Sequence, residues 1–200
     1  MKRKNVAVVL AGGSGRRIGG DLPKQFLSVG GRRIIEYSID AFDKNTGIDE
    51  IAVVVNKDFV SLMEEIAAAN SWSKLKHILN GGNERSDSSM SAIRAYAGID
   101  CNLIFHDAVR PMVSQRIISD VVSALDTYNS VAVAVPATDT IVRVDESGRM
   151  ISEILQRSLL RCQQTPQAFR YKTIAEAYKL ALADSNFVAT DDCGVVSHYL

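Results

Sequence analysis

The chain has little or none of several features that define whole classes of protein. Its three cysteines, Cys101, Cys162 and Cys193, are odd in number and widely spaced, which indicates reduced thiols rather than a disulfide framework or a cysteine-based metal site. No run approaches the roughly 20 apolar residues of a membrane-spanning helix. The 23 basic and 23 acidic residues cancel, which argues against a broad surface for nucleic acid.

The start of the chain also lacks a recognisable targeting segment. Basic residues precede the apolar run Val6–Leu10, which is too short for a secretory signal and passes directly into glycines. We therefore expect a cytoplasmic protein that binds neither membranes nor nucleic acid. A length of 200 residues, 46% of them hydrophobic, predicts one domain with a full core.

Short apolar runs predict five strands, at residues 5–11, 50–56, 75–80, 102–106 and 130–137. Most of these runs are continuously apolar, as in strands that helices cover on both faces. Between them, residues 31–42, 58–69, 88–98 and 114–128 repeat apolar side chains at helical spacing. The alternation predicts an α/β fold with a mostly parallel sheet, whose ligands lie at the loops that follow the strands.

The pattern changes after Pro136. Residues 140–155 form two extended segments around the turn Asp-Glu-Ser-Gly, which predicts a hairpin with polar outer side chains that projects from the core. We expect a further helix near Tyr171–Leu182. A last helix is expected to open at Thr190, with acidic residues in its first turn.

The stretch LAGGSGRRIGGDLPKQF, from Leu10 to Phe26, follows the first predicted strand. Its glycines allow backbone N–H groups to approach phosphate oxygens. Ile18 stands where a dinucleotide motif needs its third glycine, and Asp21 stands where a P-loop needs its lysine. A plain solvent-exposed turn would explain neither the arginines nor Pro23, which stiffens the chain before Lys24.

The same stretch resembles the nucleotidyltransferase signature L-A-[AG]-G-x-G-x-R followed by P-K-Q. It is most similar to the CTP-dependent cytidylyltransferases that act on 2-C-methyl-D-erythritol 4-phosphate or on ribitol 5-phosphate. Further matching segments follow in order: GGNERSDS (81–88), HDAVRP (106–111), PATDT (136–140), QRSLLRCQQTPQAF (156–169) and ATDD (189–192).

The resemblance implies a Rossmann-like, mostly parallel sheet flanked by helices, of the nucleotide-diphospho-sugar transferase type. It implies a single domain over residues 1–200 with a projecting β-hairpin arm at about 138–164. The implied reaction moves CMP from CTP to a polyol phosphate and releases pyrophosphate.

Roles for particular residues also follow from the resemblance. Arg17 and Lys24 would stabilise the charge that builds on the reacting α-phosphate, whereas Arg16 is expected to be exposed or structural. The CTP contacts implied are Leu10, Ala11, Gly12, Gly13, Gly15, Gly81, Gly82, Asn83, Ser88 and Asp107.

Two of these segments have plainer interpretations as well. GGNERSDS can be a helix N-terminus, with Asn83 as its cap and Arg85 on the surface. Asp107 is implied to hold Mg²⁺, or another divalent cation, against the triphosphate, and its alternative is a salt bridge with Arg110. His106 is expected to be a packed histidine at a strand end rather than a catalyst.

The polyol phosphate contacts implied by the resemblance are Arg110, Thr140, Arg157 and Thr190. In relatives the arm that carries the equivalent of Arg157 reaches over a partner subunit, so a homodimer through the arm is expected. Relatives also continue beyond the position of Leu200, so the C-terminal end of the family domain is expected to be missing here. A fused or partner reductase domain beyond Leu200 is a further expectation.

The acceptor stays open between the two polyol phosphates, which belong to isoprenoid precursor and cell-surface polymer biosynthesis. Val109 and Arg161 look more like ribitol 5-phosphate enzymes, whereas GGNERSDS and the segment Gln156–Ser158 look like the methylerythritol branch. The two readings are near even, and the balance leans slightly towards ribitol 5-phosphate. Two alternative functions are a sugar 1-phosphate nucleotidyltransferase and a non-catalytic nucleotide-binding subunit.

Overall fold

The computed structural model describes residues 3–13, 22–82, 84–184, 187 and 190–200. Its centre is a six-stranded sheet of order β5-β4-β1-β6-β10-β7. The strands are β1 (Lys4–Ala11), β4 (Glu50–Val55), β5 (Leu75–Asn80), β6 (Cys101–Asp107), β7 (Ser130–Pro136) and β10 (Arg161–Arg170). β5, β4, β1 and β6 pair in parallel, and β10 runs antiparallel to both β6 and β7.

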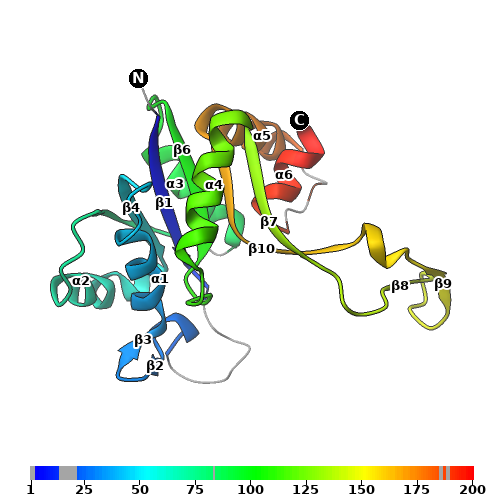
Figure 1. Ribbon diagram of the computed structural model, residues 1–200, viewed down its shortest axis with the longest axis horizontal. Coiled ribbons are helices and arrows are strands. Elements are labelled where there is room, and N and C mark those ends of the chain that lie inside the picture. Colours follow the sequence, from blue (N-terminus) through cyan, green and yellow to red (C-terminus); the bar gives the residue numbers. More distant parts are fainter. Residues whose placement is uncertain (1–2, 14–21, 83, 185–186, 188–189) are drawn as a thin grey trace.

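Helices cover both faces of the sheet (Figure 1). One face packs against α1 (Ile34–Asp43), α2 (Val60–Ala68) and α4 (Gln115–Thr127). The other packs against α3 (Arg85–Ala95), α5 (Tyr171–Ala183) and α6 (Asp192–Tyr199). The predicted α/β fold with a mostly parallel sheet is confirmed.

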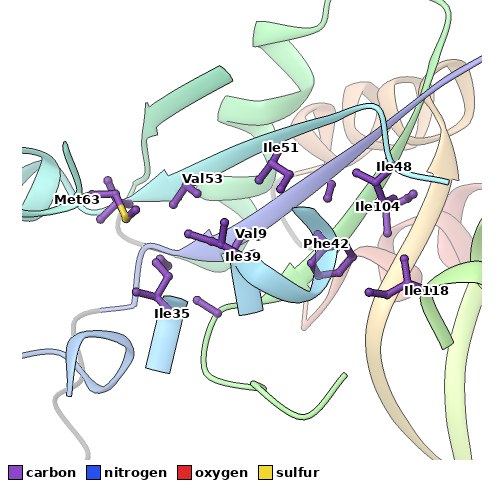
Figure 2. Close-up of a cluster of buried hydrophobic side chains, with 14 of the residues drawn as sticks. Val9, Ile35, Ile39, Phe42, Ile48, Ile51, Val53, Met63, Ile104 and Ile118 are labelled. Atoms are coloured by element: carbon purple, nitrogen blue, oxygen red, sulfur yellow. The ribbon is translucent and has the colours of Figure 1, made fainter. Parts of the chain in front are cut away.

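The double cover explains why the strand sequences are continuously apolar. Successive side chains of a strand point to opposite faces, so Ala7 and Val9 join the cluster of α1 while Val6 and Val8 join that of α3. Figure 2 shows the first cluster, in which Val9 lies close to Ile39. All four of these β1 side chains are fully buried.

β10 is a strand of the central sheet that sequence reasoning missed. It holds glutamines and Pro166, which are poor strand formers, and its pairing with β7 shifts register between Gln163 and Gln167. Its second half is nonetheless buried between β6 and β7. Burial against two neighbouring strands therefore overrides the local composition.

Two hairpins leave the sheet. The predicted hairpin is confirmed as β8 (Val142–Val144) and β9 (Ile151–Ile154), which project from the body of the protein on the arm (Figure 1). An unpredicted hairpin joins β2 (Ser28–Val29) to β3 (Arg32–Arg33). Its turn residues Gly30 and Gly31 have φ of 60° and 81°, a conformation that favours glycine.

Three short 3-10 turns complete the described elements: η1 (Lys24–Phe26), η2 (Lys57–Phe59) and η3 (Arg157–Leu159). The three cysteines are free thiols, as expected. Within the described residues, no helix has the length and apolar character that crossing a membrane requires.

One polar cluster ties the β2–β3 hairpin to the helices beside it. The carboxylate of Asp40 on α1 accepts hydrogen bonds from Arg32 Nη1 at 2.9 Å, Trp72 Nε1 at 2.7 Å and Lys44 Nζ at 3.1 Å. Burial by itself would raise the pKa of Asp40, but these three hydrogen bonds outweigh it and lower the pKa to about 2. The charged carboxylate is therefore stabilised by folding.

We expect Asp40→Asn to lower the free energy of unfolding at pH 7 by about 1–2 kcal/mol, because charge-assisted hydrogen bonds are lost. The folded pKa of about 2 lies below the ordinary 3.8, so this stabilisation is complete above pH 3.8 and is lost as the pH falls towards 2. Denaturant titrations across this range measure it. Asp120→Asn, which removes an exposed ion pair with Arg116, is the control. A pH-independent difference for Asp40→Asn would contradict the assignment.

Candidate active site

A cleft lies at the carboxyl edge of the sheet, where β1 and β6 are neighbours. The chain leaves β1 towards β4 on one side and β6 lies on the other, which is the switch point where parallel sheets bind ligands. The cleft has a volume of about 240 Å³. Its lining residues are Leu10, Ala11, Gly12, Gly13, Gln25, Glu84, Arg85, Ser88, Asp107 and Val109.

Two glycine segments approach each other beside Ser88. A Cβ at Gly12 would lie 2.5 Å from Ser88 Oγ, and a Cβ at Gly81 would lie 2.8 Å from the same atom. The N–H of Gly81 donates to the carbonyl of Val55 at 2.7 Å, which extends the hydrogen bonding between β4 and β5 by one residue. A side chain at either position would crowd Ser88 Oγ, so glycine suits the close approach of the loops after β1 and β5.

The next glycine after Gly81, Gly82, serves the start of α3. A Cβ there would lie 2.2 Å from the Cβ of Asp87, whose carboxylate accepts a hydrogen bond from the N–H of Glu84 at 3.0 Å. Gly81 and Gly82 line a neighbouring depression rather than the cleft itself. The structure thus brings Leu10, Ala11, Gly12, Gly13, Ser88 and Asp107 together, with Gly81 and Gly82 directly behind them.

Gln25 is a cleft residue that sequence reasoning did not single out. It is buried, and its Nε2 donates to the carbonyls of Ala11 at 2.6 Å and Gly13 at 3.0 Å. These bonds fasten η1, which carries the half-buried Lys24, to the loop that leaves β1. The sequence did offer a signal for Gln25. It is the glutamine of the P-K-Q motif, whose amide can bond the backbone near the end of β1.

The residue that caps the N-terminus of α3 is not the one that the sequence suggested. The cap is Glu84, which forms a capping box with Asp87, rather than Asn83. Arg85 is not on the surface, since only 28% of its side chain is exposed. Its Nη1 donates to Asp192 Oδ2 at 2.7 Å, and its Nε lies 3.5 Å from Asp107 Oδ1.

The guanidinium of Arg85 stays charged in this setting. Burial acts to lower the pKa of Arg85, but the carboxylates of Asp192 and Asp107 act more strongly together and raise it. Sequence reasoning had no local signal for this contact, because Asp192 follows Arg85 by 107 positions.

The turn after β6 joins Asp107 to Arg110. Arg110 Nε donates to Asp107 Oδ2 at 2.9 Å, and its Nη1 donates to Gln164 Oε1 at 2.6 Å. The salt bridge considered as an alternative is therefore present, while the carboxylate of Asp107 also lines the cleft. The two interpretations of Asp107 are compatible.

His106 is fully buried beneath this turn, as expected for a packed histidine. Its Nε2 lies 3.0 Å from the carbonyl of Arg110, an acceptor only, so Nε2 carries the proton and donates. Its Nδ1 accepts from the hydroxyl of Thr165 at 3.0 Å. Burial lowers the pKa of His106 to about 4, so the ring is neutral and fixes the turn.

The implied polyol contacts are more dispersed. Arg110 lies at the turn after β6, but Thr140 and Arg157 are exposed on the projecting segment, where Arg157 Nη1 donates to the carbonyl of Thr138 at 3.1 Å. Thr190 is also exposed. The expectation that Thr190 opens the last helix is wrong: Asp191 caps α6, and its Oδ1 accepts from the N–H of Gly194 at 2.7 Å.

Three predicted residues, Gly15, Arg17 and Asn83, lie outside the described residues, as does Arg16. Of the predicted catalytic pair, the structure therefore describes Lys24 alone. Also within the described residues, no group of three or more His, Cys, Asp or Glu side chains is gathered to hold a metal ion.

Comparisons with known proteins identify the family. The sequence profile of the 2-C-methyl-D-erythritol 4-phosphate cytidylyltransferase family matches residues 5–199. An enzyme of that name from Thermobifida fusca is 45% identical over 199 residues, which cover 97% of this chain and 80% of that protein. The bifunctional ribulose 5-phosphate reductase/CDP-ribitol pyrophosphorylase Bcs1 of Haemophilus influenzae is 41% identical, over 98% of this chain and 41% of that protein.

Solved structures show the same fold. The 4-diphosphocytidyl-2C-methyl-D-erythritol synthase of Anaerococcus prevotii superposes with a TM-score of 0.86 at 27% identity, covering 98% of this chain and 82% of that one. The 2-C-methyl-D-erythritol 4-phosphate cytidylyltransferase of Thermus thermophilus gives 0.71 at 26% identity, covering 98% and 84%. The chain therefore belongs to the 2-C-methyl-D-erythritol 4-phosphate cytidylyltransferase family, and it is an enzyme that transfers CMP from CTP to a polyol phosphate.

Proposed function

We propose that the acceptor is 2-C-methyl-D-erythritol 4-phosphate and that the enzyme serves isoprenoid precursor biosynthesis. The supporting observation is the family match over residues 5–199, together with the 45% identity to the Thermobifida enzyme. In this reaction a phosphate oxygen of the acceptor attacks the α-phosphorus of CTP, and pyrophosphate leaves. The proposal includes a cytoplasmic location, because CTP is a nucleotide of that compartment.

The cleft at the end of β1 would bind the nucleotide. The loop after β1 is free of Cβ atoms at Gly12 and Gly13, so phosphate oxygens can approach its backbone. Ser88, which lies against Gly12 and Gly81, offers a hydroxyl that can donate to or accept from the base or ribose. Gly15, Gly82 and Asn83 belong to the same proposed CTP contacts.

Lys24 and Arg17 would stabilise the transition state. Charge builds on the α-phosphate oxygens and on the leaving pyrophosphate, and fixed cations are the largest available means of lowering that barrier. Gln25 supports this role for Lys24, because its bonds to Ala11 and Gly13 hold the adjacent backbone beside the phosphate-binding loop.

Asp107 could bind a divalent cation as a single protein carboxylate that shares the ion with the triphosphate. Its carboxylate lines the cleft and is 25% exposed, but among the described residues it does not belong to a group of three or more possible metal ligands. Mg²⁺ is commonly held by one carboxylate, with phosphate oxygens and water as its other ligands. When bound so, Mg²⁺ would neutralise charge on the triphosphate. Arg110 holds one oxygen of Asp107 in place.

A homodimer through the arm would complete the polyol-phosphate pocket. Arg110 and Thr190 belong to the body of the subunit, whereas Thr140 and Arg157 are exposed on the projecting segment. The arm also exposes apolar side chains in a single chain: Ile151 is 63% exposed and Ile154 is 68% exposed. Exposed apolar residues grouped on a projecting hairpin favour burial against a partner subunit.

Ribitol 5-phosphate is the second candidate acceptor. The Haemophilus relative is nearly as similar as the Thermobifida enzyme, and its name includes a CDP-ribitol pyrophosphorylase. Val109, which resembles the residue of the ribitol 5-phosphate enzymes, lines the cleft and is 44% exposed. That role would belong to cell-wall polymer biosynthesis, and the reductase in the relative's name is the kind of partner domain it would need.

Pyrophosphate release with CTP and each polyol phosphate tests the choice of acceptor. We expect turnover with 2-C-methyl-D-erythritol 4-phosphate and a kcat/KM for ribitol 5-phosphate lower by about 10²-fold or more, because a mismatched acceptor leaves polar groups of the pocket unpaired. The reverse preference would establish the second candidate. Turnover with UTP and glucose 1-phosphate but not with CTP would contradict cytidylyl transfer itself.

Arg17→Ala and Lys24→Ala are each expected to lower kcat by about 10²-fold or more, since each removes a preorganised cation from the transition state. Arg16→Ala is the matched control and should retain activity. Thermal unfolding of all three variants separates lost catalysis from lost stability. Full activity of Lys24→Ala would remove that residue from the mechanism.

A mixture of Arg157→Ala and Lys24→Ala subunits tests whether the arm acts on the partner's site. Each variant alone is expected to be inactive. Mixed dimers contain one complete site if Arg157 acts across the interface, so random mixing should restore about a quarter of the activity. No restoration, with sedimentation showing that mixed dimers form, would mean that Arg157 acts within its own subunit.

A further inference from the structure

Arg85 is a partly buried cation to which the proposed function assigns no role. It opens α3, lines the cleft and has only 28% of its side chain exposed. Its Nη1 donates to Asp192 at 2.7 Å and its Nε faces Asp107 at 3.5 Å. Among the described residues its Nη2 is buried without a hydrogen-bond partner. The guanidinium of Arg85 therefore lies between the carboxylates of Asp192 and Asp107 and is not paired with one of them alone.

Asp192 is the fixed end of this arrangement. It is fully buried in the first turn of α6. Its Oδ1 accepts from the hydroxyl of Tyr178 at 2.6 Å, and its backbone N–H donates to Gln167 Oε1 at 3.1 Å. Asp192 is therefore held by α5 and β10 at once, and it gives the guanidinium of Arg85 a rigid support.

Asp107 is the other end. Arg110 Nε donates to its Oδ2 at 2.9 Å, and Arg85 Nε lies beside its Oδ1. Charges therefore alternate along Asp192, Arg85, Asp107 and Arg110, from the buried α6 to the open cleft. The planar fork of an arginine can hold one carboxylate with Nη1 and face another with Nε, whereas the point charge of a lysine cannot.

We propose that Arg85, supported by Asp192, is a positioning residue that fixes the carboxylate of Asp107 in the nucleotide cleft. The inference rests on the proposed role of Asp107 in binding CTP. It makes α6 a determinant of nucleotide affinity, although Asp192 does not line the cleft. The proposed polyol contact Thr190 comes two positions before Asp192 in the chain.

The alternative is that the ion pair only attaches α6 to α3. Removing Arg85 alone leaves the buried Asp192 without a countercharge and is expected to destabilise the fold in either case. A neutral replacement of the whole pair separates the two roles. Arg85→Met/Asp192→Asn keeps the aliphatic volume and an acceptor for Tyr178, so stability is expected to be largely retained.

The measurements are the thermal midpoint and the Kd of CTP by calorimetry, without an acceptor and without turnover. For Arg85→Met/Asp192→Asn we expect a midpoint near that of the wild type and a Kd raised by about 10-fold. Arg116→Met, the same change at an exposed site of α4, should leave the Kd unchanged. Recovery of both midpoint and Kd in the paired variant would show that the pair is only structural, and would overturn the inference.

Arg85→Lys gives a second test that keeps the countercharge of Asp192. It should fold, yet bind CTP more weakly than the wild type because the fork is lost. Wild-type Kd at an unchanged midpoint would overturn the inference.

Asp107→Asn separates failure of this inference from failure of the proposed function. If Asp107→Asn raises the Kd of CTP in the wild-type background but not in the Arg85→Met/Asp192→Asn background, the positioning role is supported. If it weakens binding equally in both backgrounds, Arg85 does not act through Asp107. If it has no effect on CTP binding in the wild type, the proposed role of Asp107 fails and the inference fails with it.

Discussion

The position of the site is determined by the burial of β1 in the centre of the sheet. β1 pairs with β4 on one side and β6 on the other, so Leu10 lies level with both Val54 and Asp107. Helices cover both of its faces, which leaves the strand no freedom to slip, since a shift by one residue would reverse every side chain. The loop after Ala11 therefore begins at a fixed point beside Asp107, and Ser88 lies against its Gly12.

Features that depend on neighbouring residues in the sequence could be predicted, whereas features that depend on contacts between distant residues could not. Apolar runs and helical spacing located the parallel strands and their helices, and the loop motifs located the cleft. β10 was missed because its burial depends on β6 and β7 rather than on its own glutamines and proline. Arg85 was misread as a surface residue because its partner Asp192 reaches it only after α5 and α6 have packed.

The described cations of the cleft are largely neutralised by the protein itself. Arg85 is paired with Asp192, and Arg110 with Asp107, so this part of the site is nearly balanced in charge. A triphosphate and a phosphate ester then need positive charge from elsewhere. That requirement is a physical argument for the proposed roles of Lys24, Arg17 and Arg157 and for the proposed divalent cation at Asp107.

In the proposed site, the two substrates contact different parts of the chain. Proposed nucleotide contacts come from loops at the rigid edge of the sheet, before residue 108, whereas three of the four proposed polyol contacts, Thr140, Arg157 and Thr190, follow β7. The acceptor can therefore change through a few residues in the last third of the chain while the nucleotide half is kept. Such a division would allow relatives at 45% and 41% identity to carry names with different polyols. Within the proposed site, the residues placed to distinguish the two acceptors are Val109, which lines the cleft, and those of the exposed arm.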